Sequence, residues 1–455
     1  MVRMTGGRMV STVLLAGVAL LVWAATWAMD SASYGTVVGV FVGGLLALAA
    51  LGMGRWTAGR EPDARVARLL LVAPLVKLAM AIPRYAVTFV VYDGTADAAS
   101  YHDEGIRLQE WYAQGVFDAD LGRPFVGTGF IRMLTGLLYS VTGPSLLGAF
   151  FVFSFVGYVG LYLFYRAFCI AVPEGQRHRY AVLVLLLPSL LFWPSSLGKE
   201  AWMTLGLGIL AYGSARLLTS QRHGFPLVLT GLMAAGAVRP HVAAIGAIAL
   251  SVAYLTRRRP PQASVLAPVG KLVGLLILGV VLVVAVGQAQ TVLGIDDFDR
   301  EAVQTARETV TVRTDQGGSA FENEQTDFDP SQFHNAVLNV LFRPFPWEAG
   351  NVQALIASLE GMVLLALFVF GWRRLLGAVR AVLRTPYIVL CITYSVLFIY
   401  GFSSFTNFGI LTRQRVQVLP FVLVLICLPP FKADQRRLRA LLVEPEDVGR
   451  HVAVR

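Results

Sequence analysis

The chain has 455 residues, of which 56% are hydrophobic and only 15% are charged, and its mean hydropathy is +0.63. This composition excludes an ordinary soluble domain and predicts an integral membrane protein. A net charge of +10 would indicate nucleic-acid binding in a soluble protein. A membrane protein instead sorts its Lys and Arg by side, so no nucleic-acid partner is expected. The three cysteines all lie in apolar runs, which predicts neither a disulfide framework nor a metal site.

Twelve apolar segments are long enough, or nearly so, to cross a bilayer. They are residues 10–29, 34–53, 69–92, 145–168, 179–193, 199–218, 225–238, 241–256, 269–289, 351–371, 386–402 and 416–431. The seventh and eighth are short, which is also typical of tilted or broken helices. We therefore predict an all-α membrane protein with about twelve transmembrane helices, forming one multi-pass domain over residues 1–455.

The basic residues predict the orientation of these helices. With the N-terminus in the cytoplasm, 25 of the 38 Lys and Arg residues fall in cytoplasmic segments, as the positive-inside rule requires. Both termini, including a tail at 432–455, are then cytoplasmic in a plasma-membrane protein. Two long polar loops, 93–144 and 290–350, are then outside. The first has apolar residues at helical spacing around Leu108 and again over 129–141, which predicts two helices lying flat in the interface. The second predicts a helix beginning at Pro330.

An acidic stretch opens the first outer loop directly after an apolar run. It contains Asp93, Asp97, His102, Asp103 and Glu104. Ionisable groups at the mouth of a membrane helix are costly, which makes them candidates for binding or catalysis. The alternative is a solvated loop that only ends a helix.

Cations mark the outer ends of four predicted helices. They are Lys199, Arg239 beside His241, Arg413 with Arg415, and Arg343 a few residues before segment 351–371. At a helix N-terminus a cation opposes the macrodipole, and the outer side is normally depleted of cations. A bound anion would reverse both effects, since N-terminal amides with Arg or Lys form a ready phosphate site. The alternative is that each cation pairs with an acidic neighbour.

Three charges lie inside predicted spans: Lys77, Arg84 and Glu360. Lys77 and Arg84 share one helix face because they are seven residues apart. We predict that one of them pairs with Glu360, although an intramembrane charge is also a functional candidate.

Outer carboxylates, flat helices and cations at the membrane surface together suit a lipid-linked phosphate donor. Glycosyl transfer from such a donor needs a base to take the acceptor's hydroxyl proton, commonly an Asp. It also needs positive charge to stabilise the departing phosphate.

These residues resemble three related groups of enzymes. The pattern Asp97-x3-Tyr101 after an early helix, two flat helices and a late outer Arg resembles the GT-C superfamily of polyprenyl-phosphate-dependent glycosyltransferases. The resemblance implies an inverting enzyme whose base is Asp97, or Asp103 in another register. The stretch from Asp97 to about Leu250 is similar to EpsG and Wzy-type polysaccharide polymerases. The motif His334-Asn335-x2-Leu338 is similar to that of O-antigen ligases, where the His is the acceptor base. Two helices rather than one precede the acidic loop, and no paired acidic residues occupy the expected site.

We therefore predict a glycosyltransferase or polysaccharide polymerase acting at the extracytoplasmic face. Its partners would be a polyprenyl-phosphate or polyprenyl-diphosphate sugar donor, a glycan or lipid-linked acceptor, and membrane lipids. A divalent cation is neither required nor excluded. The predicted catalytic residues are Asp97, Asp103 and His334, and the predicted substrate-binding residues are His102, Glu104, Lys199, Arg239, His241, Arg343, Arg413 and Arg415. The alternative is a transporter or flippase, which is disfavoured because the sequence shows no matching pair of broken helices.

Overall fold

The computed structural model describes residues 33–257 and 330–430, except positions 93, 95, 96, 119 and 383, together with the isolated residues 279, 283 and 287. These residues form helices, and no strand occurs among them. Five helices are long and apolar enough to cross a membrane, or up to seven if two bent pairs each count as one span. The all-helical prediction is confirmed for this part of the chain.

The predicted number of about twelve spans is not confirmed. Segments 10–29 and 269–289, most of the loop 290–350 and the tail 432–455 lie outside the described residues. Two other predicted segments form helices too short to pass as spans, α11 (Gly224–Gly236) and α12 (Pro240–Thr256). The predicted segments 179–193 and 199–218 contain no candidate span either.

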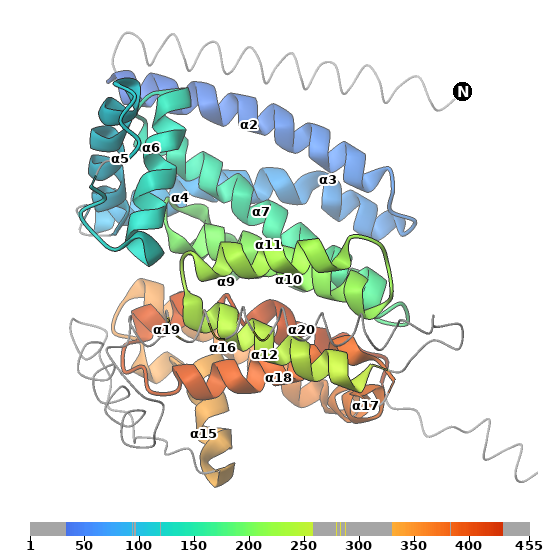
Figure 1. Ribbon diagram of the computed structural model, residues 1–455. Coiled ribbons are helices and arrows are strands. Elements are labelled where there is room, and N and C mark those ends of the chain that lie inside the picture. Colours follow the sequence, from blue (N-terminus) through green and yellow to red (C-terminus); the bar gives the residue numbers. More distant parts are fainter. Residues whose placement is uncertain are drawn as a thin grey trace, which may run out of the picture.

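Long helices lie side by side along most of the molecule (Figure 1). They include α2 (Tyr34–Ala58), α3 (Ala64–Ala79), α7 (Leu146–Ala171) and α10 (Lys199–Leu218). Glycines bring α7 and α10 into close contact, because a Cβ built on Gly160 would lie 2.3 Å from the Thr204 carbonyl oxygen. Small residues at the interface are how membrane helices approach one another without help from the hydrophobic effect.

Two helices cross one end of this bundle instead of running along it (Figure 1). They are α5 (Asp97–Ala113) and α6 (Phe130–Thr142), which pack against each other. With the preceding π-helical turn η2 (Phe125–Gly129), α6 is long enough to count as a candidate span, but its direction agrees with the predicted flat helix. Leu108 and Tyr112 are buried, as the amphipathic pattern predicts.

The third predicted span is continuous in sequence but changes its hydrogen-bonding pattern. After α3, helix α4 (Ala81–Ala86) leads into the π-helical turn η1 (Val87–Val91). The acidic stretch then follows at once, so that α5 begins at Asp97. Asp97 was expected in a loop and lies instead in the first turn of a helix, where a carboxylate is favoured by the macrodipole.

A broken helix lies in the middle of the bundle. Helix α8 (Arg177–Leu186) ends before Pro188, where the short α9 (Pro188–Phe192) begins and leads into a 3-10 turn, η3 (Trp193–Ser195). Lys77 Nζ donates hydrogen bonds to the Leu190 and Leu191 carbonyl oxygens at 3.0 and 2.6 Å. Glu360 Oε2, on α16 (Val352–Phe370), accepts a hydrogen bond from the Ser189 amide at 2.6 Å.

The predicted pairing of Lys77 or Arg84 with Glu360 is therefore wrong. A break in a buried helix leaves backbone N–H and C=O groups without partners, which is costly in an apolar interior. Lys77 and Glu360 satisfy such groups on α9 instead of each other.

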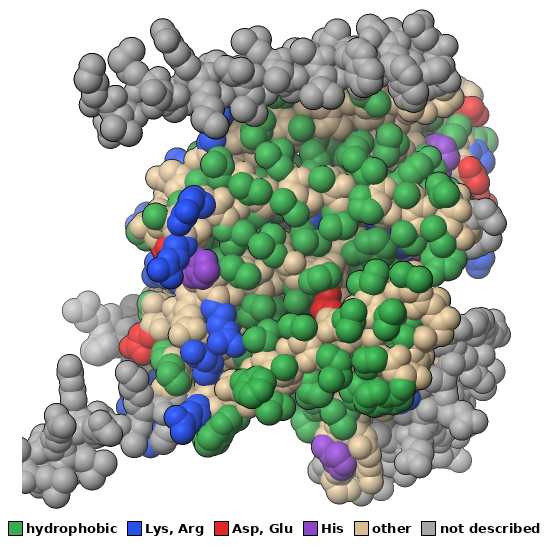
Figure 2. Space-filling view, turned by 180° about the vertical axis from the view of Figure 1, so that it is seen from behind, with side chains coloured by type: hydrophobic (Ala, Val, Ile, Leu, Met, Phe, Trp, Pro, Cys, Tyr) green, Lys and Arg blue, Asp and Glu red, His purple; other side chains and the backbone are tan. Residues whose placement is uncertain are grey.

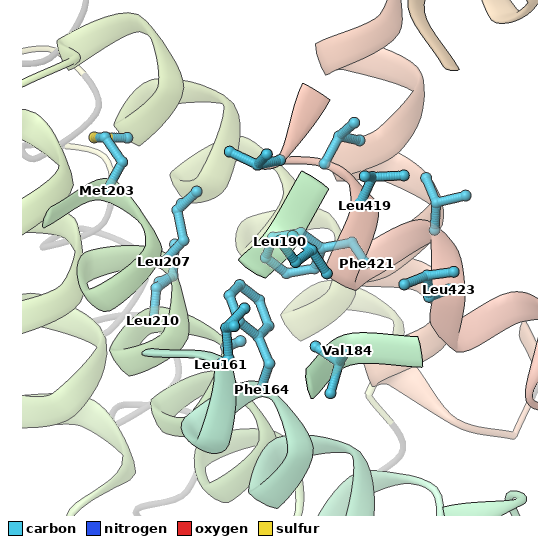
Figure 3. Packing of buried hydrophobic residues seen from close by; sticks show 14 of the residues in the cluster. Leu161, Phe164, Val184, Leu190, Met203, Leu207, Leu210, Leu419, Phe421 and Leu423 are labelled. Atoms are coloured by element: carbon cyan, nitrogen blue, oxygen red, sulfur yellow. The ribbon is translucent and has the colours of Figure 1, made fainter. Parts of the chain in front are cut away.

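The last predicted span, 416–431, contains only the short α20 (Leu419–Ile426). Helix α19 (Phe408–Arg415) precedes it, and the two helices are bent by 62° relative to each other. Arg413 and Arg415 were predicted at a helix N-terminus but lie in the last turn of α19, where a cation is favoured by the macrodipole. Figure 3 shows Leu419, Phe421 and Leu423 facing the apolar side chains of the central helices.

The remaining described helices and turns belong to the C-terminal part of the chain, residues 330–402. They are η4 (Pro330–Gln332), α15 (Phe333–Val337), η5 (Leu338–Phe342), η6 (Pro346–Glu348), α17 (Trp372–Val382) and α18 (Pro386–Phe402). The predicted helical start at Pro330 is confirmed. Figure 2 shows an apolar band across the molecule, with Lys and Arg side chains gathered mostly at one end.

Candidate functional site

Four side chains, three on different helices and one directly before a helix, form a chain of ionic contacts. Both terminal nitrogens of Arg413 on α19 lie 3.3 Å from Asp97 Oδ2 on α5. Arg413 Nε lies 2.9 Å from Glu200 Oε1 on α10. Arg239, the residue before α12, donates a hydrogen bond from Nη2 to the same Glu200 oxygen at 2.9 Å. We call Asp97, Arg413, Glu200 and Arg239 the charge chain.

The charge chain runs from the interior of the protein to its surface. The side chains of Glu200 and Arg239 are 6% and 7% exposed, that of Arg413 is 29% exposed and that of Asp97 is 57% exposed. A buried carboxylate is tolerated only when it is paired, and Glu200 has an arginine on each side. The exposed end, Asp97 with Arg413, is open to a substrate.

Local sequence explains how these groups come together. Glu200 lies in the first turn of α10, where a carboxylate is favoured, and Pro240 starts α12 directly after Arg239. The two arginines of α19 point different ways, as a two-residue spacing on a helix requires. Arg413 contacts the carboxylates, whereas buried Arg415 donates to the Leu341 and Arg343 carbonyl oxygens at 2.8 and 3.2 Å.

Two further cations lie close to the charge chain. Lys199 is within electrostatic range of Asp97, Arg239 and Arg413. Arg84 on α4 is within range of Glu200 and Arg413. The described site therefore combines four cations with two carboxylates, an excess of two positive charges. An anion would balance this excess.

Tyr101 on α5 lies among the same groups. Burial, followed by the nearby Asp97 and Glu200 carboxylates, raises the pKa of the Tyr101 phenol. The phenol is therefore a neutral hydroxyl, able to donate a hydrogen bond, over the whole physiological pH range. Neither Tyr101 nor Glu200 nor Arg84 was among the residues predicted to form the site.

The other predicted residues of α5 face a different neighbour. His102 Nδ1 lies 2.6 Å from the Tyr139 hydroxyl of α6, and Glu104 pairs with Arg107 at 2.8 Å. Burial lowers the pKa of His102, although the nearby Asp103 carboxylate acts in the opposite direction. The first contact links α5 to α6, and the second lies within α5; neither involves a residue of the charge chain.

Three remaining predicted residues are held by other contacts. His241 is within electrostatic range of Arg239, and its ring packs 5.9 Å from that of Phe402. Arg343 pairs with Glu348 at 2.5 Å, as the alternative of acidic neighbours predicts. His334 is exposed on α15, and its Nδ1 lies 2.8 Å from Ser331 O within the same turn.

Two neighbouring apolar cavities lie close to the charge chain, although no charge-chain residue lines either of them. The larger, about 540 Å³, lies between η1, α9 and α16. The smaller, about 220 Å³, shares Tyr92 and Ala357 with the first and reaches Thr412, the residue before Arg413. A third cavity of about 1010 Å³ lies on the other side of α4, between α2, α5 and α7.

Among the described residues, no three His, Cys, Asp or Glu side chains are grouped so as to hold a metal ion. Comparison with known proteins gives no family: no family model, no curated protein and no solved structure matches the chain. The described part defines an all-helical protein with five to seven helices able to cross a membrane and a buried charge chain that reaches the surface at one end.

Proposed function

We propose that this protein is a membrane glycosyltransferase or polysaccharide polymerase using a sugar donor linked to polyprenyl phosphate or diphosphate. The observation that carries the proposal is the exposed end of the charge chain. There an accessible carboxylate, Asp97, meets Arg413 within a cluster that has excess positive charge. A proton acceptor beside an anion site is what glycosyl transfer from a phosphate donor needs.

In the proposed reaction, Asp97 takes the proton of the acceptor hydroxyl. The hydroxyl oxygen forms a bond to the anomeric carbon of the donor sugar, and the bond from that carbon to the phosphate oxygen breaks. The phosphate keeps the electron pair of the broken bond, and Arg413, Lys199 and Arg84 stabilise its charge. Attack from the face opposite the phosphate inverts the anomeric centre.

The polar partners of Arg413 fit this sequence of events. Its two terminal nitrogens contact Asp97, whereas its Nε faces Glu200, which is buried. An arriving phosphate would take over the terminal nitrogens while Glu200 keeps the guanidinium in place. Asp97 would then be released as an unpaired carboxylate, which is a better base.

The test replaces the chromosomal gene by variants and measures the lipid-linked sugars extracted from membranes by mass spectrometry. Asp97→Asn keeps the shape of the side chain and removes the base, so the lipid-linked donor should accumulate. His334→Ala is the control and should leave the lipid profile of the wild type. Accumulation with His334→Ala but not with Asp97→Asn would refute the assignment and favour the ligase-like motif.

A transporter or flippase is the second candidate, and one observation favours it. The breaks at α8–α9 and α19–α20 lie in helices that pack on each other, since α8 contacts α20. Discontinuous helices that meet in a bundle are typical of secondary transporters. The sidedness of the accumulated lipid decides between the two. If an inactive transferase causes the accumulation, the donor lies in the outer leaflet and is oxidised by periodate added to spheroplasts. If an inactive flippase causes it, the donor lies in the inner leaflet and is protected from periodate.

A further inference from the structure

The lateral cavity between η1, α9 and α16 opens toward the surface that would face lipid. Its walls include Val91, Val352 and Ile356, which are 64%, 75% and 57% exposed. Its volume of about 540 Å³ falls in the range of about 300–1,000 Å³ typical of ligand pockets. Such a cavity accepts an apolar chain entering sideways from the bilayer.

Arg84 lies next to two aromatic residues of the cavity wall. Its guanidinium carbon is 4.9 Å from the ring centres of Phe192 and of Trp193, which both line the cavity. The buried Nε has no hydrogen-bond partner among the described residues. The aromatic faces hold the guanidinium plane by cation–π contact and leave its edge free for an anion.

The route from Arg84 to the catalytic end of the charge chain is short. Arg84 is within electrostatic range of Glu200 and Arg413, and also of Tyr92, which lines the cavity. The adjoining smaller cavity extends from Tyr92 to Thr412, next to Arg413. Positive charge therefore continues from the head of the apolar cavity to Asp97.

The cavity also contains one carboxyl group, which must be compatible with an apolar occupant. Glu360 directs Oε2 to the Ser189 amide, and the buried Arg415 is within its electrostatic range. The carboxyl group thus caps α9 through Oε2 and lies at the side of the cavity formed by α9 and α16.

The geometry points to a lipid-phosphate site in which the chain of a polyprenyl phosphate fills the lateral cavity and Arg84 binds its phosphate. This inference rests on the proposed function and deepens it, since it assigns the donor's lipid and entry route. The charge complementarity with Arg84, Lys199 and Arg413 commits the site to an anionic lipid. A neutral lipid would leave the guanidinium edge without a partner.

The test measures binding of undecaprenyl phosphate to the purified full-length protein in detergent by native mass spectrometry. Undecaprenol, which has the chain without the phosphate, and inorganic phosphate, which lacks the chain, are the reference probes. Arg84→Gln should weaken undecaprenyl phosphate binding roughly ten- to a hundredfold and leave undecaprenol binding unchanged. Ala357→Trp, which fills the cavity, should weaken binding of both lipids.

Two matched variants keep the test specific. Ile82→Trp places the same indole ring in the wall of the cavity on the other side of α4, and should bind undecaprenyl phosphate as the wild type does. Arg60→Gln removes an exposed arginine stacked on Trp56 and should also bind normally. Melting temperatures of all variants identify any that are misfolded, and Arg84→Lys then replaces Arg84→Gln, with a smaller loss expected.

Undecaprenyl phosphate bound equally by wild type, Arg84→Gln and Ala357→Trp would overturn the inference. So would a loss in Ile82→Trp as large as that in Ala357→Trp. The inference and the proposed function fail separately. Binding that depends on Arg84, with no donor accumulation in Asp97→Asn cells, upholds the lipid site and refutes the transferase. Accumulation in those cells, with lipid binding insensitive to Arg84 and Ala357, upholds the transferase and refutes the site.

Discussion

Replacing Glu200 tests whether the charge chain is a coupled unit. In Glu200→Leu, the Arg239 guanidinium, only 7% exposed, loses its carboxylate partner. Removing one partner of a buried ion pair costs about 3–5 kcal/mol, because the other charge stays buried and uncompensated. The loss of Glu200 should cost less free energy at Arg413, because this side chain is 29% exposed and keeps its contact with Asp97. The expected loss in unfolding free energy is therefore about 3–5 kcal/mol.

A double variant separates pairing from simple loss of packing. Glu200→Leu combined with Arg239→Met removes both charges and keeps the side-chain volume. Since apolar replacement of a whole buried pair is often neutral, the double variant should be more stable than Glu200→Leu alone. The two changes should then be non-additive by about 0.5–3 kcal/mol.

The assay is unfolding of the purified protein in mixed micelles by added sodium dodecyl sulfate, followed by circular dichroism. Glu104→Gln is the control, because the Glu104–Arg107 pair is 28% and 38% exposed and should contribute less than about 1 kcal/mol. A loss below about 1 kcal/mol for Glu200→Leu, or strict additivity in the double variant, would refute the reasoning.

Three further predictions concern topology, the helix break and pH. A cysteine replacing Gln114 should be labelled by an impermeant maleimide in intact cells, and a cysteine replacing Gln221 should not. The reverse pattern would show that the predicted orientation in the membrane is wrong. Glu360→Leu should lower the unfolding free energy by about 1–3 kcal/mol, because it leaves the Ser189 amide without an acceptor. Glu360→Gln keeps an acceptor and should lower it less. Equal losses in the micelle assay would contradict the capping role. Because burial lowers the pKa of His102 in the folded state, its contribution to stability is present above about pH 6.5 and is lost as pH falls. On acidification, the unfolding free energy of His102→Gln should therefore fall less than that of the wild type. Parallel curves of unfolding free energy against pH for the two proteins would contradict this prediction.

Hydropathy and residue spacing predict a helix well where the local sequence determines where the helix begins and ends. The apolar segments predicted at 199–218 and 241–256 agree closely with α10, which begins at Lys199, and α12, which begins at Pro240. Interruptions inside apolar runs were not predicted. The break before Pro188 depends on Lys77 and Glu360, which are more than a hundred residues away in sequence and cap backbone groups that no local pattern marks.

The candidate site was predicted in part. The sequence singled out Asp97, Lys199, Arg239 and Arg413, and these do gather near one another. The sequence did not single out Glu200, although this residue directly follows Lys199. Nothing in the local pattern indicates that its carboxylate contacts both Arg239 and Arg413. The sequence placed His334 in the site on a short motif and Arg343 as a cation near a predicted helix start. Neither pattern shows which neighbour a side chain meets after folding.

The most direct measurement uses membranes from cells that carry Asp97→Asn, in which the unused lipid-linked donor is expected to accumulate. A lipid extract of these membranes is reconstituted with purified protein and with the acceptor glycans and lipids of wild-type membranes, and loss of the accumulated lipid is followed by mass spectrometry. Wild-type and His334→Ala proteins should convert it to polyprenyl phosphate or diphosphate, while Asp97→Asn protein should bind it and leave it intact. Conversion by Asp97→Asn at the wild-type rate, with His334→Ala inactive, would contradict the assignment of Asp97 as the base.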